Sequence, residues 1–305
     1  MNIQQLEYVV ALDTHRHFVT AADSCFVTQA TLSMMVKKLE EELGSKIFDR
    51  SKQPIVPTNV GVKIIEQAKV ILAEHRKLNE IVTQEKKEVA GELRLGVIPT
   101  LAPYIVPLFL NNFLKKYPGV SLKIKELLTV DIIHQLEQNQ IDAGLVAIPL
   151  EVEGMKEYPL FKEDFIVYSG AKNQLLNKKY IPTKDIDTEQ LLLLEEGHCL
   201  RTQIINLCAL KAIEKEHKHF ELTAGSIETL KNIVEANRGI TILPKLALNG
   251  MTKAQLKNTR AFQHPIPRRE IGFVTYRYYV KERILKALQD EILAVIPQEM
   301  HFKNE

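Results

Sequence analysis

Two cysteines, Cys199 and Cys208, are the residues of this sequence best suited to redox chemistry. Cys199 follows His198 directly, after a run of four leucines that predicts a buried strand and a Glu-Glu-Gly break. Helical spacing of apolar residues begins at Leu200. The unpaired amides at a helix start stabilise negative charge, so Cys199 is well placed to become a thiolate. His198 could assist as a cation or as a hydrogen-bond donor.

The separation of the two cysteines leaves two interpretations open. If residues 199–208 were all helical, a rise of roughly 1.5 Å per residue would put the two Cα atoms about 13 Å apart. A disulfide requires them within roughly 7 Å. Either the segment is not a plain helix, or bridging the two sulfurs would remodel it and act as a redox switch. Alternatively, both are ordinary buried thiols, since free cysteines are among the most buried side chains.

Composition indicates a soluble globular protein. The 305 residues suggest about two domains, with 45% hydrophobic and 26% charged residues. No apolar run reaches membrane-spanning length, and no secretory signal opens the chain. Three cysteines do not make a disulfide framework, so we expect a cytoplasmic location and no membrane association. The net charge of +2 neither requires nor excludes a nucleic acid.

Residues 1–58 are predicted to form an all-α winged helix-turn-helix domain. The third helix, Gln29 to Leu43 with Thr28 as its cap, has one apolar face and one face of short polar and basic side chains, as a helix in the DNA major groove requires. The candidate DNA contacts are Thr28, Gln29, Thr31, Ser33, Met34, Lys37, Lys38 and Arg50. The alternative is a helical domain with a solvated polar face. The charge balance does not distinguish between these two interpretations, since residues 1–90 hold twelve basic and twelve acidic residues.

Residues 59–90 are predicted to be one long linker helix. Apolar residues recur at alternating steps of four and three, as in a coiled-coil seam. The seam residues are Ile64, Ala68, Ile71, His75, Leu78 and Val82. Such a stripe must be buried, most simply against a second copy of the chain, so we predict a dimerisation helix; packing onto the second domain would give the same pattern.

Residues 91–305 alternate strand and helix patterns, which predicts two α/β lobes built on parallel sheets. Lobe I is expected at about 91–164 and 270–305, and lobe II at about 165–269, with a ligand cleft between them. The sequence contains no phosphate-binding glycine motif, no zinc-ligand spacing and no hydrolase elbow. We therefore expect no cofactor and no metal.

The N-terminal segment LEYVVALDTHRHFVTAADSCFVTQATLSMMVKKLEEELGSKIFDR closely resembles the DNA-binding domain of LysR-type transcriptional regulators. The linker helix and the two-lobed domain fit the same family, so the resemblance covers nearly the whole chain. Further segments are similar to its hydrogen-peroxide-sensing members: LEEGHCLRTQ followed by a cysteine after four intervening residues, HRHFVTAADSC, GVIPTLAPY, SIETLKNIV, GITILP and PRREIGFV. The resemblance implies two Rossmann-like, periplasmic-binding-protein-like subdomains in the effector domain.

The resemblance also implies roles for individual residues. Cys199 matches the peroxide-reactive cysteine that is oxidised to a sulfenic acid, and Cys208 the resolving cysteine that closes a disulfide. Thr100 and Thr129 match residues that bind peroxide. The groups that stabilise the reactive sulfur and the leaving oxygen match His198 and Arg269. The implied function is a peroxide-responsive activator of oxidative-stress genes, not an enzyme. Its partners would be double-stranded promoter DNA, RNA polymerase and further copies in a dimer or tetramer.

Several of these residues also have a simpler interpretation. Thr100 and Thr129 could be helix caps, and His198 could bond a backbone carbonyl. Arg269, between Arg268 and Glu270, could form a surface ion pair that stabilises little. Cys25 is expected to serve packing. His217 and His219 match no common metal-ligand spacing.

The sequence departs from the family pattern at three places: Ala30 replaces a common proline, Met34-Met35 replaces smaller or more polar residues, and Thr202 replaces an acidic residue of some relatives. Two other functions remain open. One is a LysR-type regulator that binds a small metabolite between its lobes, with incidental cysteines. The other is a thiol peroxidase, which would need neither a DNA-reading helix nor a long dimerisation helix.

Overall fold

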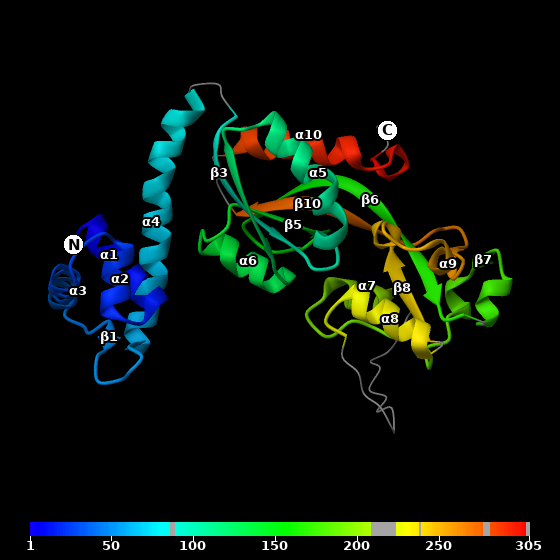
Figure 1. Ribbon diagram of the computed structural model, residues 1–305, viewed down its shortest axis with the longest axis horizontal. Helices are drawn as coiled ribbons and strands as arrows, with labels where there is room; N and C mark the ends of the chain where they lie inside the picture. Colours follow the sequence, from blue (N-terminus) through cyan, green and yellow to red (C-terminus); the bar gives the residue numbers. More distant parts are fainter. Residues whose placement is uncertain (86–88, 172, 209–223, 238, 277–280, 303–305) are drawn as a thin grey trace. The chain divides into compact units, whose positions relative to one another are not determined.

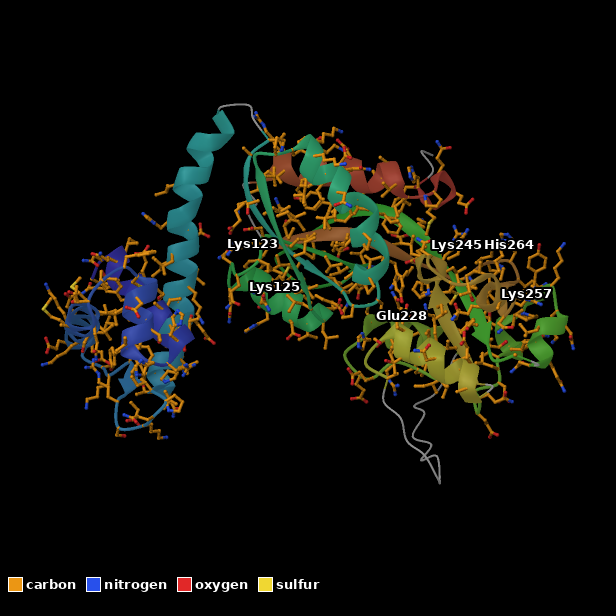
Figure 2. All side chains as sticks on the ribbon, in the orientation of Figure 1. Lys123, Lys125, Glu228, Lys245, Lys257 and His264 are labelled. Carbon is orange, nitrogen blue, oxygen red and sulfur yellow. The ribbon has the colours of Figure 1, made fainter. Side chains whose placement is uncertain are left out.

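A computed structural model describes residues 1–85, 89–171, 173–208, 224–237, 239–276 and 281–302. They form two compact units, the first built mainly of Met1–Glu88 and the second mainly of Val89–Glu305 (Figure 1). Within these ranges, no helix combines the length and the apolarity that crossing a membrane requires.

The first unit is a winged helix-turn-helix, as the sequence predicts. Its helices are α1 (Ile3–His15), α2 (Phe18–Ser24) and α3 (Gln29–Leu43), followed by the short antiparallel strands β1 (Phe48–Asp49) and β2 (Val56–Pro57). Thr28 caps α3 by accepting a hydrogen bond from the Thr31 amide at 3.2 Å. The helix ends at Gly44, whose φ of 65° lies in the left-handed region that glycine adopts readily.

The long helix α4 (Asn59–Glu85) has a stripe that is only partly available to a second chain. Ile65, Ala68 and Leu72 are buried in the core of the first unit, and Ile64 and Ile71 pack against that core. The N-terminal part of the predicted seam is therefore already buried within its own unit, where α4 packs against α1. Beyond it, His75 is exposed and Leu78 is 63% exposed. The side chain of Val82 lies outside the described residues.

The second unit contains an eight-stranded mixed sheet, ordered β4-β3-β5-β10-β6-β9-β7, with β8 paired to β6. Its first part joins β3 (Gly91–Val97), β4 (Val120–Glu126) and β5 (Ala143–Ile148) in parallel. Helices α5 (Ala102–Lys116) and α10 (Glu282–Val295) lie along one side of these strands and α6 (Thr129–Glu137) on the other (Figure 1). Together they form an α/β layer of the predicted class.

Several strands pair antiparallel and not in the predicted parallel direction. β10 (Arg268–Tyr276) is antiparallel to both β5 and β6 (Met155–Ser169). β6 is a single 15-residue strand: its first part pairs with β10, and its last five residues pair with β8 (Ile240–Pro244). The pattern of apolar residues sets which face of a strand is buried, but it carries no information about strand direction.

The remaining elements complete the sheet around β6. β9 (Thr259–Phe262) is antiparallel to β6 and parallel to β7 (Tyr180–Ile181). The helices of this part are α7 (Cys199–Leu207), α8 (Ile227–Asn237) and the short α9 (Lys253–Leu256).

One predicted strand does not form. Leu191 and Leu194 each make one isolated bridge, to Ile240 and Ala224, without a continuous strand between them. Both are buried, so the leucine run serves the core as expected. Apolar runs of this length do not by themselves distinguish a strand from another buried segment.

Candidate functional site

Cys199 is the first residue of α7, as the sequence predicts, and His198 occupies the position before it. Gly197 turns the chain into the helix with a φ of 92°, where a Cβ atom would also meet Leu128 at 3.1 Å. Arg201 then fixes the helix start by donating from Nη1 to the Leu194 carbonyl at 2.9 Å. The Cys199 side chain is half-buried and carries a free thiol. Its position places it at the positive end of the α7 dipole.

A small cavity lies at this helix start. Its empty volume is about 140 Å³, but its walls are too close together to admit a water molecule. It is lined by Ile98, Pro99, Thr100, Leu128, Thr129, Gly197, His198 and Cys199. The fold therefore brings together four of the six predicted redox-site residues, from the segment after β3, the start of α6 and the start of α7.

Arg269 is joined to this cavity through Thr100. Its Nη1 donates to the Thr100 hydroxyl at 3.0 Å, and its Nη2 to the Thr100 carbonyl at 3.2 Å. The opposite side of the guanidinium is paired with Glu163, with Nε and Nη2 at 2.8 and 2.7 Å from Oε2. Neither side chain of this pair is exposed. The interpretation of Arg269 as a surface ion pair is therefore wrong.

Glu163 is a residue that the sequence analysis missed. Besides Arg269, it accepts a hydrogen bond from the Leu246 amide at 2.7 Å. It faces Arg269 across β6 and β10, strands that lie about a hundred residues apart in the chain. Nothing local in the sequence marks this acid, because its partner comes from so distant a strand.

The two threonines are not helix caps. Thr100 precedes Leu101, the residue before α5, and its hydroxyl accepts from Arg269 instead of from a helix amide. Thr129 is already inside α6, and its buried hydroxyl has no hydrogen-bond partner among the residues that the structure describes. A threonine hydroxyl that caps nothing remains available to a small polar ligand.

His198 is buried at 4% exposure and does not bond a backbone carbonyl within the described ranges. Its Nδ1 has no hydrogen-bond partner there, and its Nε2 lies 3.8 Å from a carboxylate oxygen of Glu195. A buried imidazole that faces a carboxylate on one side and has an unused nitrogen on the other can donate or accept a hydrogen bond at the cavity.

Cys208 lies immediately after α7 and caps its C-terminal end. Its thiol is free and half-buried, and burial raises its pKa above the ordinary value. Because Cys199 to Leu207 is helical, the two Cα atoms are about 13 Å apart at roughly 1.5 Å per residue. This is the second of the two interpretations considered above: a plain helix separates the sulfurs, and a bond between them requires that helix to open.

No group of three or more potential metal ligands occurs among the described residues. Cys25 is half-buried against the core of the first unit, which fits the packing role expected for it. His217 and His219 lie outside the described residues.

The predicted DNA contacts lie on the outer surface of α3 and on the wing. Thr28, Gln29, Met34, Lys37 and Lys38 are exposed, whereas Thr31 and Ser33 are half-buried. Arg50 is also exposed, and its guanidinium pairs with Glu40 at 2.8 Å and lies over the Phe18 ring. Glu40 also accepts from the amides of Ile47 and Phe48 and so fixes the wing against α3.

Comparison with known families identifies both units. Residues 3–62 match the model described as "Bacterial regulatory helix-turn-helix protein, lysR family", and residues 86–296 match "LysR substrate binding domain". The chain belongs to the LysR family. Its winged helix-turn-helix is thus the DNA-binding part of a LysR-family regulator, and its sheet unit is the part that carries the cavity beside Cys199.

Two curated relatives within the LysR family span almost the whole chain. The "Hydrogen peroxide-inducible genes activator" of Haemophilus influenzae is 36% identical over 97% of this chain and 99% of that protein. The "DNA-binding transcriptional dual regulator OxyR" of Escherichia coli is 38% identical over 90% of this chain and 89% of that protein. The relatives of this LysR-family chain are therefore transcriptional regulators.

Solved structures agree with this assignment. Full-length OxyR from Pseudomonas aeruginosa, with a cysteine-to-aspartate substitution, matches with a TM-score of 0.79 and 31% identity, covering 97% of this chain and 99% of that one. A cysteine mutant of OxyR from Corynebacterium glutamicum with bound hydrogen peroxide matches with a TM-score of 0.64 and 28% identity, covering 96% and 92%.

Proposed function

We propose that this chain is a hydrogen-peroxide-sensing transcriptional regulator. The observation that carries the proposal is the cavity at the start of α7, where a free thiol shares a small space with two threonine hydroxyls and a buried histidine. Relatives named as hydrogen-peroxide-inducible activators, and a related OxyR structure with bound peroxide, support the choice of oxidant.

The proposed reaction begins at Cys199. The thiolate attacks one oxygen of hydrogen peroxide, the O–O bond breaks, and the second oxygen leaves as hydroxide, which takes up a proton to become water. The product is a sulfenic acid on Cys199. The Cys208 sulfur then attacks this sulfenic sulfur, a second water leaves, and a disulfide forms. Two thiols and one peroxide are thereby converted to one disulfide and two water molecules.

The cavity residues take complementary roles in the first step. The Thr100 hydroxyl accepts from Arg269, so its own proton can be donated to a peroxide oxygen. The Thr129 hydroxyl, which has no partner in the described part of the chain, offers a second hydrogen bond, and His198, which lines the same cavity, acts as a further donor. Arg269 acts through Thr100 and supplies fixed positive charge where hydroxide develops. Because peroxide is larger than water, these side chains must separate slightly to admit it.

The second step couples chemistry to structure. Two Cα atoms about 13 Å apart cannot be joined by a disulfide, which needs them within roughly 7 Å. The disulfide therefore excludes the α7 helix, and the effector domain has two mutually exclusive states. We assign the effector domain to residues 91–305, with lobe I at about 91–164 and 270–305 and lobe II at about 165–269, joined through β6 and β10.

Residues 1–58 would bind double-stranded promoter DNA, and α4 would join two copies through its exposed residues His75 and Leu78. A tetramer, contact with RNA polymerase and a cytoplasmic location complete the proposal. Changing the state of the effector domains would reposition the DNA-binding domains along a promoter and so alter transcription.

The test is a count of free thiols by alkylation and intact mass, before and after one equivalent of hydrogen peroxide. Two thiols should disappear together in the wild-type chain. In Cys199→Ser, which should still bind DNA, both remaining thiols, Cys25 and Cys208, should stay free. Three free thiols in the wild-type chain after peroxide treatment would refute the redox proposal. Sustained peroxide consumption with a thiol reductant, independent of DNA, would instead indicate a peroxidase.

A further inference from the structure

Phe26 is the most exposed large apolar side chain of the described residues, at 96%. It lies in the turn between α2 and α3 with a φ of 57°. Its amide donates to the Asp23 carbonyl, and the next amide, of Val27, donates to the Ala22 carbonyl, both at 3.1 Å. These bonds close the end of α2 in the manner of a Schellman motif, with Phe26 at the left-handed position.

Neither backbone conformation nor core packing explains a phenylalanine at this position. The left-handed region suits glycine, and asparagine tolerates it, whereas a bulky side chain there is an outlier. The ring also gains nothing from burial in its own unit, because almost all of its surface is exposed. Because Phe26 neither suits its backbone conformation nor contributes buried apolar surface, its side chain indicates a contact outside the chain.

The position of Phe26 identifies that contact. It lies two residues before Thr28, the cap of α3, and three before the exposed Gln29, the first residue of the same helix. This is the end of a recognition helix that meets base edges in helix-turn-helix proteins. Residues 3–62, which match the regulatory helix-turn-helix model, include Phe26. Its ring therefore continues the DNA-binding surface.

We infer that Phe26 is a specificity-determining DNA contact that packs against the 5-methyl group of a thymine in the major groove. A phenyl ring can neither donate nor accept the hydrogen bonds by which polar base edges are read. The thymine methyl is the apolar group that the major groove presents, and phenylalanine is among the side chains that contact it. The inference rests on the proposed DNA binding.

The test uses the full-length chain and a duplex selected from a random-sequence library by the wild-type protein. Each thymine of the selected site is replaced in turn by deoxyuridine, which removes only the methyl group. Binding of each duplex to wild type, Phe26→Ala and Phe26→Asn is measured by fluorescence anisotropy. Leu43→Ala serves as the matched control, because Leu43 is 41% exposed at the other end of α3.

We expect Phe26→Ala to bind the selected duplex about tenfold more weakly, as for loss of one buried aromatic contact. One thymine per half-site should show a methyl effect in wild type that is absent in both Phe26 variants. Leu43→Ala should retain wild-type affinity. Phe26→Asn should melt at the same temperature as wild type or higher, because asparagine tolerates the left-handed conformation.

The outcomes separate the inference from the proposed function. If the wild-type chain selects no duplex, DNA binding itself fails. If Phe26→Ala binds the selected duplex with wild-type affinity, the inference about Phe26 is overturned while the proposed DNA binding still stands. If that variant instead changes the self-association of the chain, the ring belongs to a contact between copies. Weaker binding with the same methyl effects as wild type at every thymine would overturn base reading by Phe26. A lower melting temperature of Phe26→Asn would show that the ring supports the fold.

Discussion

Arg269 and Glu163 are direct cross-strand partners on β10 and β6, and their charged groups meet at 2.7 Å with neither side chain exposed. Charges removed from water are stable only when paired, and removing one partner leaves the other uncompensated. The pair also fixes the guanidinium from which Thr100 receives two hydrogen bonds. The stability of this part of the fold and the geometry of the cavity therefore depend on the same two residues.

Glu163→Gln should lower the free energy of unfolding by about 3 kcal/mol, because it leaves the Arg269 charge buried without a counter-ion. Urea denaturation at pH 7 measures this loss. The control is Glu270→Gln, which removes the half-exposed pair between Glu270 and Lys162 on the same two strands and should cost less than about 1 kcal/mol. Equal losses in the two variants would contradict the importance of the buried pair.

Thr129→Val should separate reactivity from stability. The Thr129 hydroxyl has no partner among the described residues, so replacing it with a methyl group should leave the free energy of unfolding within about 0.5 kcal/mol. If it binds peroxide, oxidation of Cys199 should slow about tenfold, which stopped-flow kinetics can measure.

Two further valine substitutions are controls for this experiment. In the described part of the chain, Thr275 on β10 is also buried with an unpartnered hydroxyl, but it does not line the cavity. Thr275→Val should therefore change neither the free energy of unfolding nor the oxidation rate of Cys199. Thr100→Val should slow oxidation and also cost about 1–3 kcal/mol, because an Arg269 donor loses its acceptor. Unchanged oxidation in Thr129→Val would remove Thr129 from the peroxide site.

Substitutions at Thr202 should change how readily α7 opens. It is exposed within the helix, where threonine is a poor helix former and alanine the best. Thr202→Ala should stabilise α7 and slow disulfide closure about twofold to threefold, whereas Thr202→Gly should accelerate it by a similar factor. Trapping the sulfenic acid should show an unchanged first step in both. Identical closure rates in the two variants would show that helix opening does not limit the disulfide.

Asp142 should make the second unit sensitive to acid. Burial alone would raise the pKa of its carboxyl, but the hydrogen bonds and charge of Arg94, together with the charge of Lys281, hold this pKa below its ordinary value. The unfolded chain therefore binds a proton more readily than the folded one. The stability contributed by Asp142 is present above the unfolded pKa of about 4 and is lost as pH falls through the folded pKa.

Urea denaturation between pH 7 and pH 2 tests this dependence. Asp142→Asn should cost about 3 kcal/mol at neutral pH, and the difference from wild type should shrink as the pH falls. Asp290→Asn, which removes an exposed pair with Lys286, should show a loss below about 1 kcal/mol. A difference between Asp142→Asn and wild type that stays constant with pH would rule out this carboxylate as the titrating group.

Local signals predicted the local elements well. Thr28 and Gly44 mark the ends of α3, and the helical spacing after Cys199 placed this cysteine at the start of α7. Such boundaries depend on residues within a few positions of one another, so they can be read from the chain. The fold class was predicted for the same reason, from the alternation of strand and helix patterns.

Long-range relationships were not accessible in this way. Whether Arg269 lies on the surface depends on the direction of β10 and on Glu163, which the chain places 106 residues away. The threonines were expected to be caps because both precede helices, but the register of α5 and α6 leaves their hydroxyls to other partners. The cavity combines three separate segments, and only the resemblance to known regulators linked them beforehand.

The length of α7 makes the proposed sensor respond to the duration of oxidative stress as well as to its strength. Cys199 lines the proposed peroxide site at the start of α7, but the second sulfur of the proposed disulfide lies at the far end of this helix. A sulfenic acid reduced by a cellular thiol before the helix opens leaves transcription unaltered. If the nine residues of α7 open more slowly than the sulfenic acid is reduced, the proposed sensor would not respond to brief pulses of oxidant.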